Sequence, residues 1–175
     1  MSGYGGKELA KAFRTVRNNT LQIAEDIPAD QYDFVPAPGL RSVGALLTHI
    51  AMTAKLQEDF HRTRRLTTLQ GYDFPAIIGA LAAEEQKPRS KEDIIALLKG
   101  EGEQFASWLE SLSPEFLDET YGDHTGANPR TRFEGLLSPK EHEMHHRAQL
   151  MLAQRLMGIV PHLTRAMQAR MAARP

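Results

Sequence analysis

Hydrophobic residues recur at steps of three and four positions along four long stretches of this chain, residues 7–27, 43–64, 91–112 and 138–157. That spacing places them on one face of an α-helix, which turns once every 3.6 residues. The polar residues between them fall on the opposite face, so each stretch is predicted to be an amphipathic helix with one buried side. In the first stretch the apolar face is formed by Leu9, Phe13, Val16, Thr20, Ile23 and Ile27.

Residues that favour helix ends lie beside these stretches. Ser42 precedes the second helix, and Ser90, with an acidic residue three positions later, precedes the third. A serine side chain at such a position accepts hydrogen bonds from the free N–H groups of the first turn. The fourth helix is predicted to begin with Ser138 as its cap and Pro139 in the first helical position. Gly158 is placed to end it.

The rest of the chain is predicted to form short helices and connectors. Short helices are expected at 75–86 and 162–173, a proline- and glycine-rich connector at 34–39, and a loop with at most a short extended piece at 113–137. Several connections exceed about 15 residues, so at least one is expected to cross over and join parallel helices. The predicted fold is an all-α four-helix bundle with a crossover connection and short extra helices. Residues 1–175 are expected to form this single helical-bundle domain.

Composition narrows the range of functions. Of the 175 residues 41% are apolar and 25% charged, which suits a globular domain that folds without a structural metal. Lys and Arg total 21 against 22 Asp and Glu, so we expect no nucleic-acid partner and no membrane partner. The chain has no cysteine, which excludes disulfides and thiolate metal ligands. Because it shows neither a signal peptide nor a membrane-spanning apolar run, a cytoplasmic protein is expected.

Three of the seven histidines lie together in the fourth long helix. His142 and His146 are four residues apart, so their side chains differ by only about 40° around the helix and can point at one centre. His145 is less well aimed and is expected to flank that centre. His49 lies within the apolar face of the second long helix, where an unpaired ring would be unfavourable. We therefore predict that His49, His142 and His146 bind one divalent metal ion.

Each histidine taken alone has a second interpretation. His49 also fits a hydrogen-bonded core histidine, which is the commoner environment for a lone histidine on an apolar face. His61, His124 and His162 fall on polar flanks or in loops and are expected at the surface. The metal hypothesis therefore depends on the two helices bringing their rings together.

Three neutral imidazoles would leave a divalent ion its full charge and at least one open coordination position, as in catalytic zinc sites. A water molecule or a substrate thiol in that position would lose a proton more readily. Imidazole suits several transition metals, so the sequence does not identify the ion, and zinc and nickel are the first candidates.

Two glutamates are candidates for a role beside the metal. Residues 142–146 match the H-E-x-x-H pattern of zinc metalloproteases, which makes Glu143 a candidate catalytic base. No predicted strand could hold a peptide substrate, and Glu143 could instead form a surface ion pair with Arg147. Glu101, between two glycines in the third long helix, would either support the metal site or reach water at the edge of the apolar face.

Two segments resemble a known family. Residues 46–51 (LLTHIA) and 142–150 (HEMHHRAQL) resemble the paired histidine motifs of the DinB superfamily, and the resemblance covers roughly residues 7–160. It implies a four-helix bundle, commonly dimeric, with a metal ion bound at the positions of His49, His142 and His146. The second motif often has glycine where this chain has Ala148, a change between small residues that affects no ligand.

The predicted function is that of a metal-dependent enzyme, of hydrolase or thiol-transferase type, acting on a small molecule. Some members of the resembled family activate a low-molecular-weight thiol, so such a thiol is a candidate substrate, and a homodimer is expected. A second hypothesis is a non-catalytic metal- or small-ligand-binding protein of the stress response. A third is a purely structural bundle whose histidines are polar core residues.

Overall fold

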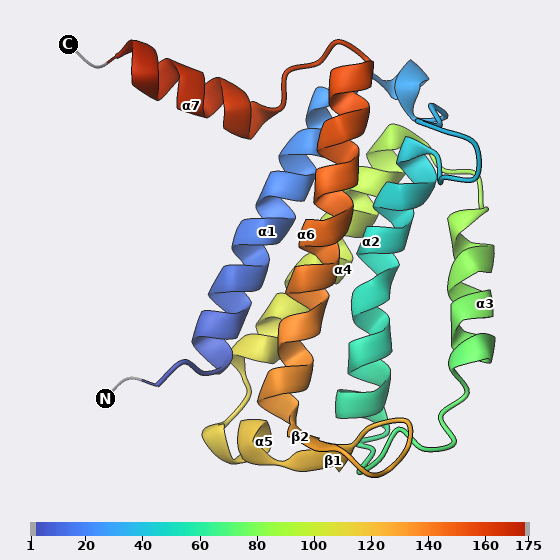
Figure 1. The fold of residues 1–175 in the computed structure, drawn as a ribbon, viewed down its shortest axis with the longest axis vertical. Coiled ribbons are helices and arrows are strands. Elements are labelled where there is room, and N and C mark those ends of the chain that lie inside the picture. The colour runs from blue at the N-terminus through green and yellow to red at the C-terminus, as the bar shows by residue number, and fades with distance from the viewer. Residues whose placement is uncertain (1–2, 174–175) are drawn as a thin grey trace.

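The computed structural model describes residues 3–173, and its main feature is a set of four long helices packed side by side (Figure 1). These helices are α1 (Gly6–Asp26), α2 (Val43–Glu58), α4 (Lys91–Glu110) and α6 (Arg132–Leu156). The predicted four-helix bundle is therefore confirmed. The remaining elements are a 3-10 turn (Ala29–Gln31), a π-helical turn that continues α2 (Asp59–Thr63), α3 (Phe74–Glu85), α5 (Pro114–Asp118), β1 (Thr120–Gly122), β2 (Pro129–Thr131) and α7 (His162–Ala172).

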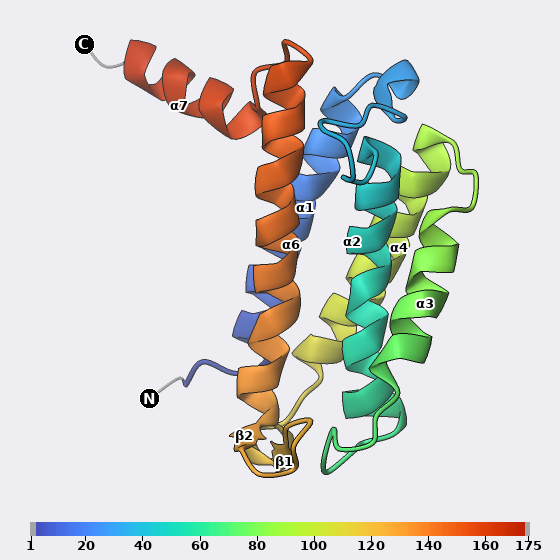
Figure 2. The ribbon, with the colours of Figure 1, turned by 45° about the vertical axis from the view of Figure 1, so that its right-hand side comes forward.

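The order of the helices around the bundle differs from their order in the chain. α1 packs against α4 and α6, and α2 packs against the same two helices, so α1 and α2 occupy opposite corners. Figures 1 and 2 show α1 and α6 running one way and α2 and α4 running the other. α2 and α4 are thus parallel neighbours, and the chain between them returns along the outside of the bundle through α3. This is the crossover connection that the long linkers predicted.

The apolar faces of the four helices meet in two groups of buried side chains, one toward each end of the bundle. The group near the 3-10 turn includes Ile23, Leu47, Leu98 and Leu150. The group toward α5 includes Phe13, Phe105, Trp108 and Leu136. Burial of large apolar side chains stabilises a fold by about 1.5–3 kcal/mol each, so these two groups hold the four helices together.

The start of α6 differs from the prediction, which placed its cap at Ser138. Thr131 caps the helix instead: its hydroxyl accepts a hydrogen bond from the Glu134 N–H, and the Glu134 carboxylate accepts one from the Thr131 N–H. This reciprocal pair satisfies two N–H groups that the first turn leaves free. Pro139 lies inside the helix and is buried there, which leaves one backbone hydrogen bond unmade.

The earlier start changes the position of the histidines within α6. His142 and His146 lie near the middle of the helix rather than in its first turn and a half. The positive end of the helix dipole is therefore too distant to act on them, because its effect falls off within the first turn.

The segment 113–137, expected as a loop, contains more regular structure than the sequence indicated. α5 is followed by strands β1 and β2, which pair antiparallel with Tyr121 opposite Arg130. Each strand has three residues, and the pair lies at one end of the bundle (Figure 1). The expectation that this segment lacks a strand pair was wrong.

α7 projects from the other end of the bundle, as Figures 1 and 2 show. The Nε2–H of its first residue, His162, donates to Asn19 of α1, and Arg165 pairs with Asp26. No residue of α7 is buried. Within residues 3–173, no helix combines the length and the apolar character that a membrane crossing requires.

Candidate metal centre

The three predicted metal ligands meet between α2 and α6. His49 comes from α2, which Ser42 caps by accepting a hydrogen bond from Ala45 N, and His142 and His146 come from successive turns of α6. The Nε2 atom of His142 lies 3.2 Å from that of His49 and 3.1 Å from that of His146. One ring nitrogen from each of the three residues lies within 4.8 Å of the other two. The structure therefore brings together the residues that the sequence singled out.

The opposite nitrogens of two rings are already engaged. The Nδ1 atom of His49 lies 2.7 Å from a carboxylate oxygen of Glu85, and the Nδ1 atom of His146 lies 2.9 Å from the amide oxygen of Gln149. A carboxylate or amide oxygen can only accept, so each Nδ1 carries the proton. In these two neutral rings Nε2 is therefore unprotonated, and its lone pair faces the ring of His142.

This donor set fits a metal ion. The Nε2 atom of His142 can carry at most one proton and could donate it to only one of its two neighbours, which would leave the other contact between two lone pairs. A cation at the centre removes that repulsion. Zinc–nitrogen bonds of about 2.0–2.1 Å in a tetrahedral site place neighbouring nitrogens roughly 3.3 Å apart, close to the distances of His142 Nε2 from its two neighbours, 3.1 and 3.2 Å.

Protonation does not provide such a cation at neutral pH. Burial, together with the neighbouring rings of His146 and His49, lowers the pKa of His142 to about 4. Burial also lowers the pKa of His49, although its hydrogen bond to Glu85 opposes the shift. The pKa of His146 is lowered by burial as well, so all three rings are held in the neutral form that binds metal ions.

Glu85, the last residue of α3, is the main feature of the site that the sequence did not reveal. It is a buried carboxylate that accepts hydrogen bonds from Arg41 as well as from His49. Burial raises the pKa of the Glu85 carboxyl, but the hydrogen bonds from Arg41 and His49 outweigh it, and the net pKa is lowered. An ionised carboxylate therefore fixes the tautomer and the orientation of the His49 ring, as is common behind metal-binding histidines.

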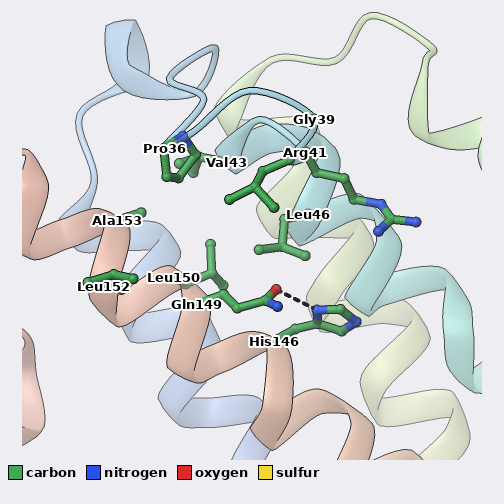
Figure 3. A pocket seen from close by; sticks show the side chains of 11 residues that line it. Pro36, Gly39, Arg41, Val43, Leu46, His146, Gln149, Leu150, Leu152 and Ala153 are labelled. Carbon is green, nitrogen blue, oxygen red and sulfur yellow. Dashed lines mark hydrogen bonds between the residues drawn. The ribbon is translucent and has the colours of Figure 1, made fainter.

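Gln149 does the same for His146, and Figure 3 shows its side chain directed at that ring. The amide nitrogen of Gln149 donates to Nε2 of His145, an exposed histidine that flanks the cluster as expected. The spacing of three residues between His146 and Gln149 was a signal for this contact, because residues three apart are neighbours on a helix.

Glu143 lies neither at the metal site, as a catalytic base would, nor in an ion pair at the surface. It is 2% exposed, and both of its carboxylate oxygens accept hydrogen bonds from Arg17 of α1 at 3.0–3.1 Å. The predicted surface ion pair with Arg147 is therefore wrong. The structure directs the Glu143 carboxylate to a buried guanidinium, and the residue is not among the group that could hold the metal.

Glu101 also has a definite partner away from the histidines. Its carboxylate pairs with Lys55 of α2 at 2.7 Å, with 19% of the Glu101 side chain exposed. Of the two glycines beside it, Gly102 is required by Arg17: a Cβ there would lie 2.7 Å from the guanidinium nitrogen Nη1. Gly100 faces open space.

The remaining histidines were expected at the surface, and His61 contradicts this. It is 0% exposed, and its Nδ1 accepts a hydrogen bond from Arg132 at 3.1 Å. The π-helical turn at the end of α2 carries the ring inward. His124 is exposed as expected, whereas His162 is half-buried against α1.

Two cavities adjoin the three histidines. One, of about 180 Å³, is lined by His146 together with residues of the 36–41 connector, α2 and α6. The other, of about 320 Å³, is lined by His49, His142, Glu85 and the inner face of α3. Of the segments outside the four long helices, α3 and the 36–41 connector line these cavities, and segment 113–137 lines neither.

A family model described as the DinB superfamily matches residues 12–150 of this chain. The chain belongs to the DinB superfamily. This confirms the resemblance carried by the two histidine motifs, whose three ligand candidates are the residues that converge in the structure.

Two relatives of this DinB-superfamily chain come from Bacillus subtilis. YjoA, from strain 168 and described as uncharacterized, is 25% identical over 152 residues, which cover 86% of this chain and 90% of YjoA. The crystal structure of YjoA, described as a DinB-like protein, has a TM-score of 0.64 at 26% identity, with 86% of this chain and 92% of that one covered. YfiT, described as a probable metal-dependent hydrolase with an unusual four-helix bundle topology, has a TM-score of 0.68 at 18% identity over 91% of each chain. At that identity the likeness to YfiT shows a shared fold.

Proposed function

We propose that this protein is a metal-dependent hydrolase of small molecules that binds one divalent ion through His49, His142 and His146. The observation that carries the proposal is the convergence of three Nε2 atoms while the Nδ1 atoms of two of the rings are engaged elsewhere. The description of YfiT as a probable metal-dependent hydrolase supports the reaction class. The proposal takes the chain as a single functional domain.

The residues of the chain have distinct tasks in this proposal. Glu85 and Gln149 keep the protons of His49 and His146 on Nδ1, so that Nε2 stays free for the ion. Arg41 keeps Glu85 ionised. A divalent ion bound by three neutral imidazoles would supply Lewis-acid polarisation and keep at least one coordination position for a reactant, with zinc and nickel as the first candidates.

Glu143, the candidate base from the sequence, has a structural task in this proposal, as the partner of Arg17. Arg17 binds both of its carboxylate oxygens, so neither is free to take a proton from a reactant. A peptidase reaction of the H-E-x-x-H type would need that free carboxylate.

Transfer of a low-molecular-weight thiol is the second candidate. The two cavities beside the histidines favour it, because one can hold the thiol while the other holds its acceptor. A screen of the metal-loaded protein with esters, amides and thiol–electrophile pairs separates the two reactions. If the metal-loaded protein accelerates none of these reactions beyond the metal-free protein, the non-catalytic binding hypothesis replaces both hydrolysis and thiol transfer.

The metal site is tested by elemental analysis of protein purified without an affinity tag. Wild-type protein is expected to contain stoichiometric divalent metal, and His142→Ala is expected to lose it because two imidazoles alone bind weakly. His145→Ala is the matched control, since the adjacent ring lies outside the converging group. Full metal retention in His142→Ala would remove the assigned site.

We also propose that the chain forms a homodimer. α7 supports this, because its exposed residues include Leu163, Met167 and Met171, which are 40%, 58% and 65% exposed. A row of large apolar side chains on a projecting helix is typical of a surface that another chain covers.

A further inference from the structure

The smaller of the two cavities differs from the rest of the site in its chemistry. It lies between the 36–41 connector, the start of α2 and the last turns of α6, and most of its lining side chains are apolar. Figure 3 shows Leu46 and Leu150 pointing into it from α2 and α6, beneath Pro36 and Val43. His146 lines one end, so the cavity lies directly beside one of the three proposed metal ligands.

The polar side chains around this cavity already have hydrogen-bond partners within the protein. The amide oxygen of Gln149 accepts from His146, and its amide nitrogen donates to His145. The guanidinium of Arg41 pairs with Glu85, and Figure 3 shows it directed away from Leu46 and Leu150. A charged or strongly hydrogen-bonding group placed here would lose its water without gaining partners, which is unfavourable.

The volume limits what can enter. About 180 Å³ is similar to a protein cavity of about 150 Å³ that accepts benzene. It is smaller than the roughly 300–1,000 Å³ of a pocket that encloses a whole drug-sized ligand. The cavity therefore suits one compact part of a substrate, of the size of a phenyl ring or a branched alkyl group.

We infer that this cavity is a specificity subsite that binds a compact, uncharged apolar group attached directly to the metal-reactive group of the substrate. The inference rests on the proposed function, because the reactive group is positioned at His146 and its two partner histidines. The larger cavity on the α3 side, which is bordered by Arg41 and Glu85, then receives the more polar remainder or the second reactant.

The test compares two hydroxamates that bind a metal ion through the same two oxygens but differ in their side group. Benzohydroxamate carries a phenyl ring and acetohydroxamate a methyl group, so the ratio of their dissociation constants on metal-loaded protein reports the apolar subsite alone. Burial of the ring is expected to make benzohydroxamate bind at least about tenfold more tightly. Metal content is measured on each sample.

Two variants locate the effect. Ala153→Leu fills the cavity, and the preference for the phenyl compound is expected to fall to within about twofold. Leu152→Asp places a charge on its lining at a position 57% exposed, where folding is not at risk, and should reduce the preference as well. Leu156→Asp, one turn further along α6 at 58% exposure and outside the lining, is the matched control and should keep the full preference.

The outcomes separate this inference from the proposed function. The subsite is overturned if metal-loaded wild-type protein binds the two hydroxamates equally well. It is also overturned if wild type prefers benzohydroxamate tenfold and both cavity variants keep that preference. If no preparation holds metal, the proposed function fails, and benzyl alcohol titrated into methyl-labelled protein tests the cavity by itself. Shifts confined to the methyl signals of Leu46, Leu150 and Ala153 support the subsite, and unchanged signals overturn it.

Discussion

Glu85 acts on the proposed metal only through the ring of His49, and a single substitution can test that role. Glu85→Gln keeps the size of the side chain and an oxygen that accepts from Nδ1, but removes the negative charge that makes the ring a stronger ligand. We expect the metal affinity to fall about 10–100-fold, while the amount of metal bound at saturation stays the same. Competition with a coloured chelator measures the affinity.

The neighbouring glutamate provides the control for this experiment. Glu84 pairs with Lys87 and Arg89 at the surface of α3 and does not contact the histidines. Glu84→Gln removes the same charge one residue away and should leave the affinity as in wild type. If Glu85→Gln binds metal as tightly as wild type, Glu85 does not position His49.

His61 gives the protein a pH-dependent stability that is independent of any metal. Burial, together with the positive charges of Arg132 and Arg130, lowers the pKa of this ring from 6.5 to about 3. In the unfolded chain the ring takes up a proton near pH 6.5, whereas the folded protein excludes that proton until about pH 3. The unfolded state thus binds more protons between these values, and the free energy of unfolding falls as pH drops through that range.

Urea unfolding at a series of pH values checks this prediction. His61→Gln is expected to flatten the dependence below pH 6.5 by at most about 1.4 kcal/mol per pH unit, the value for one proton, with no change of slope above pH 6.5. Comparison with wild type removes the contributions of the other groups whose pKa is lowered, namely Glu119, His49, His142 and His146. His124→Gln, at an exposed position, should behave as wild type. An unchanged slope in His61→Gln would contradict the assignment.

At the scale of the helices, Arg17 ties all four members of the bundle together. It extends from α1, binds Glu143 of α6, and donates to the backbone carbonyls of Leu98 in α4 and Ile50 in α2. Glu143→Gln would leave the buried guanidinium without a counter-charge, which typically destabilises a protein by about 3–5 kcal/mol. Replacing both partners with apolar residues of similar size, Arg17→Met with Glu143→Leu, should recover most of that loss.

Chemical denaturation measures these differences, with an exposed pair as reference. Glu25→Gln breaks a surface pair with Lys99 in which both side chains are about half exposed, and should cost less than about 1 kcal/mol. If Glu143→Gln costs no more than Glu25→Gln, the buried pair does not hold the helices together.

The features that the sequence predicted well depend on short spacings. The periodic apolar positions predict α1 and α4 closely, and the spacing of four residues between His142 and His146 follows from helix geometry alone. His49 was identifiable because a polar ring inside an apolar face needs a partner. The local cap signals were less reliable: Ser138 and Pro139 resemble a helix start, but the capping box at Thr131 comes first in the chain and sets the start of α6.

The features that the sequence did not reveal join distant positions. Glu85 lies 36 residues after His49, and Glu143 lies 126 residues after Arg17, so no local pattern links either pair. Both pairs depend on how the helices are arranged around the bundle, which apolar periodicity leaves open. His61 was missed for a related reason, because the π-helical turn at the end of α2 directs it inward where a regular helix pattern predicts an exposed side chain.

For the molecule as a whole, contacts within one chain do not account for the stability of α7. It has eleven residues, none of them buried, and isolated helices shorter than about 12–15 residues are marginal in water. A second copy that covers Leu163, Met167 and Met171 would supply the missing burial. We therefore expect the protein to sediment at twice the mass of one chain, and Met167→Lys to shift it toward the monomer, because a buried lysine charge would oppose association. Ile78→Lys changes an equally exposed apolar residue on α3 and should leave the sedimenting mass unchanged. A wild-type protein that stays monomeric at all concentrations would exclude the homodimer.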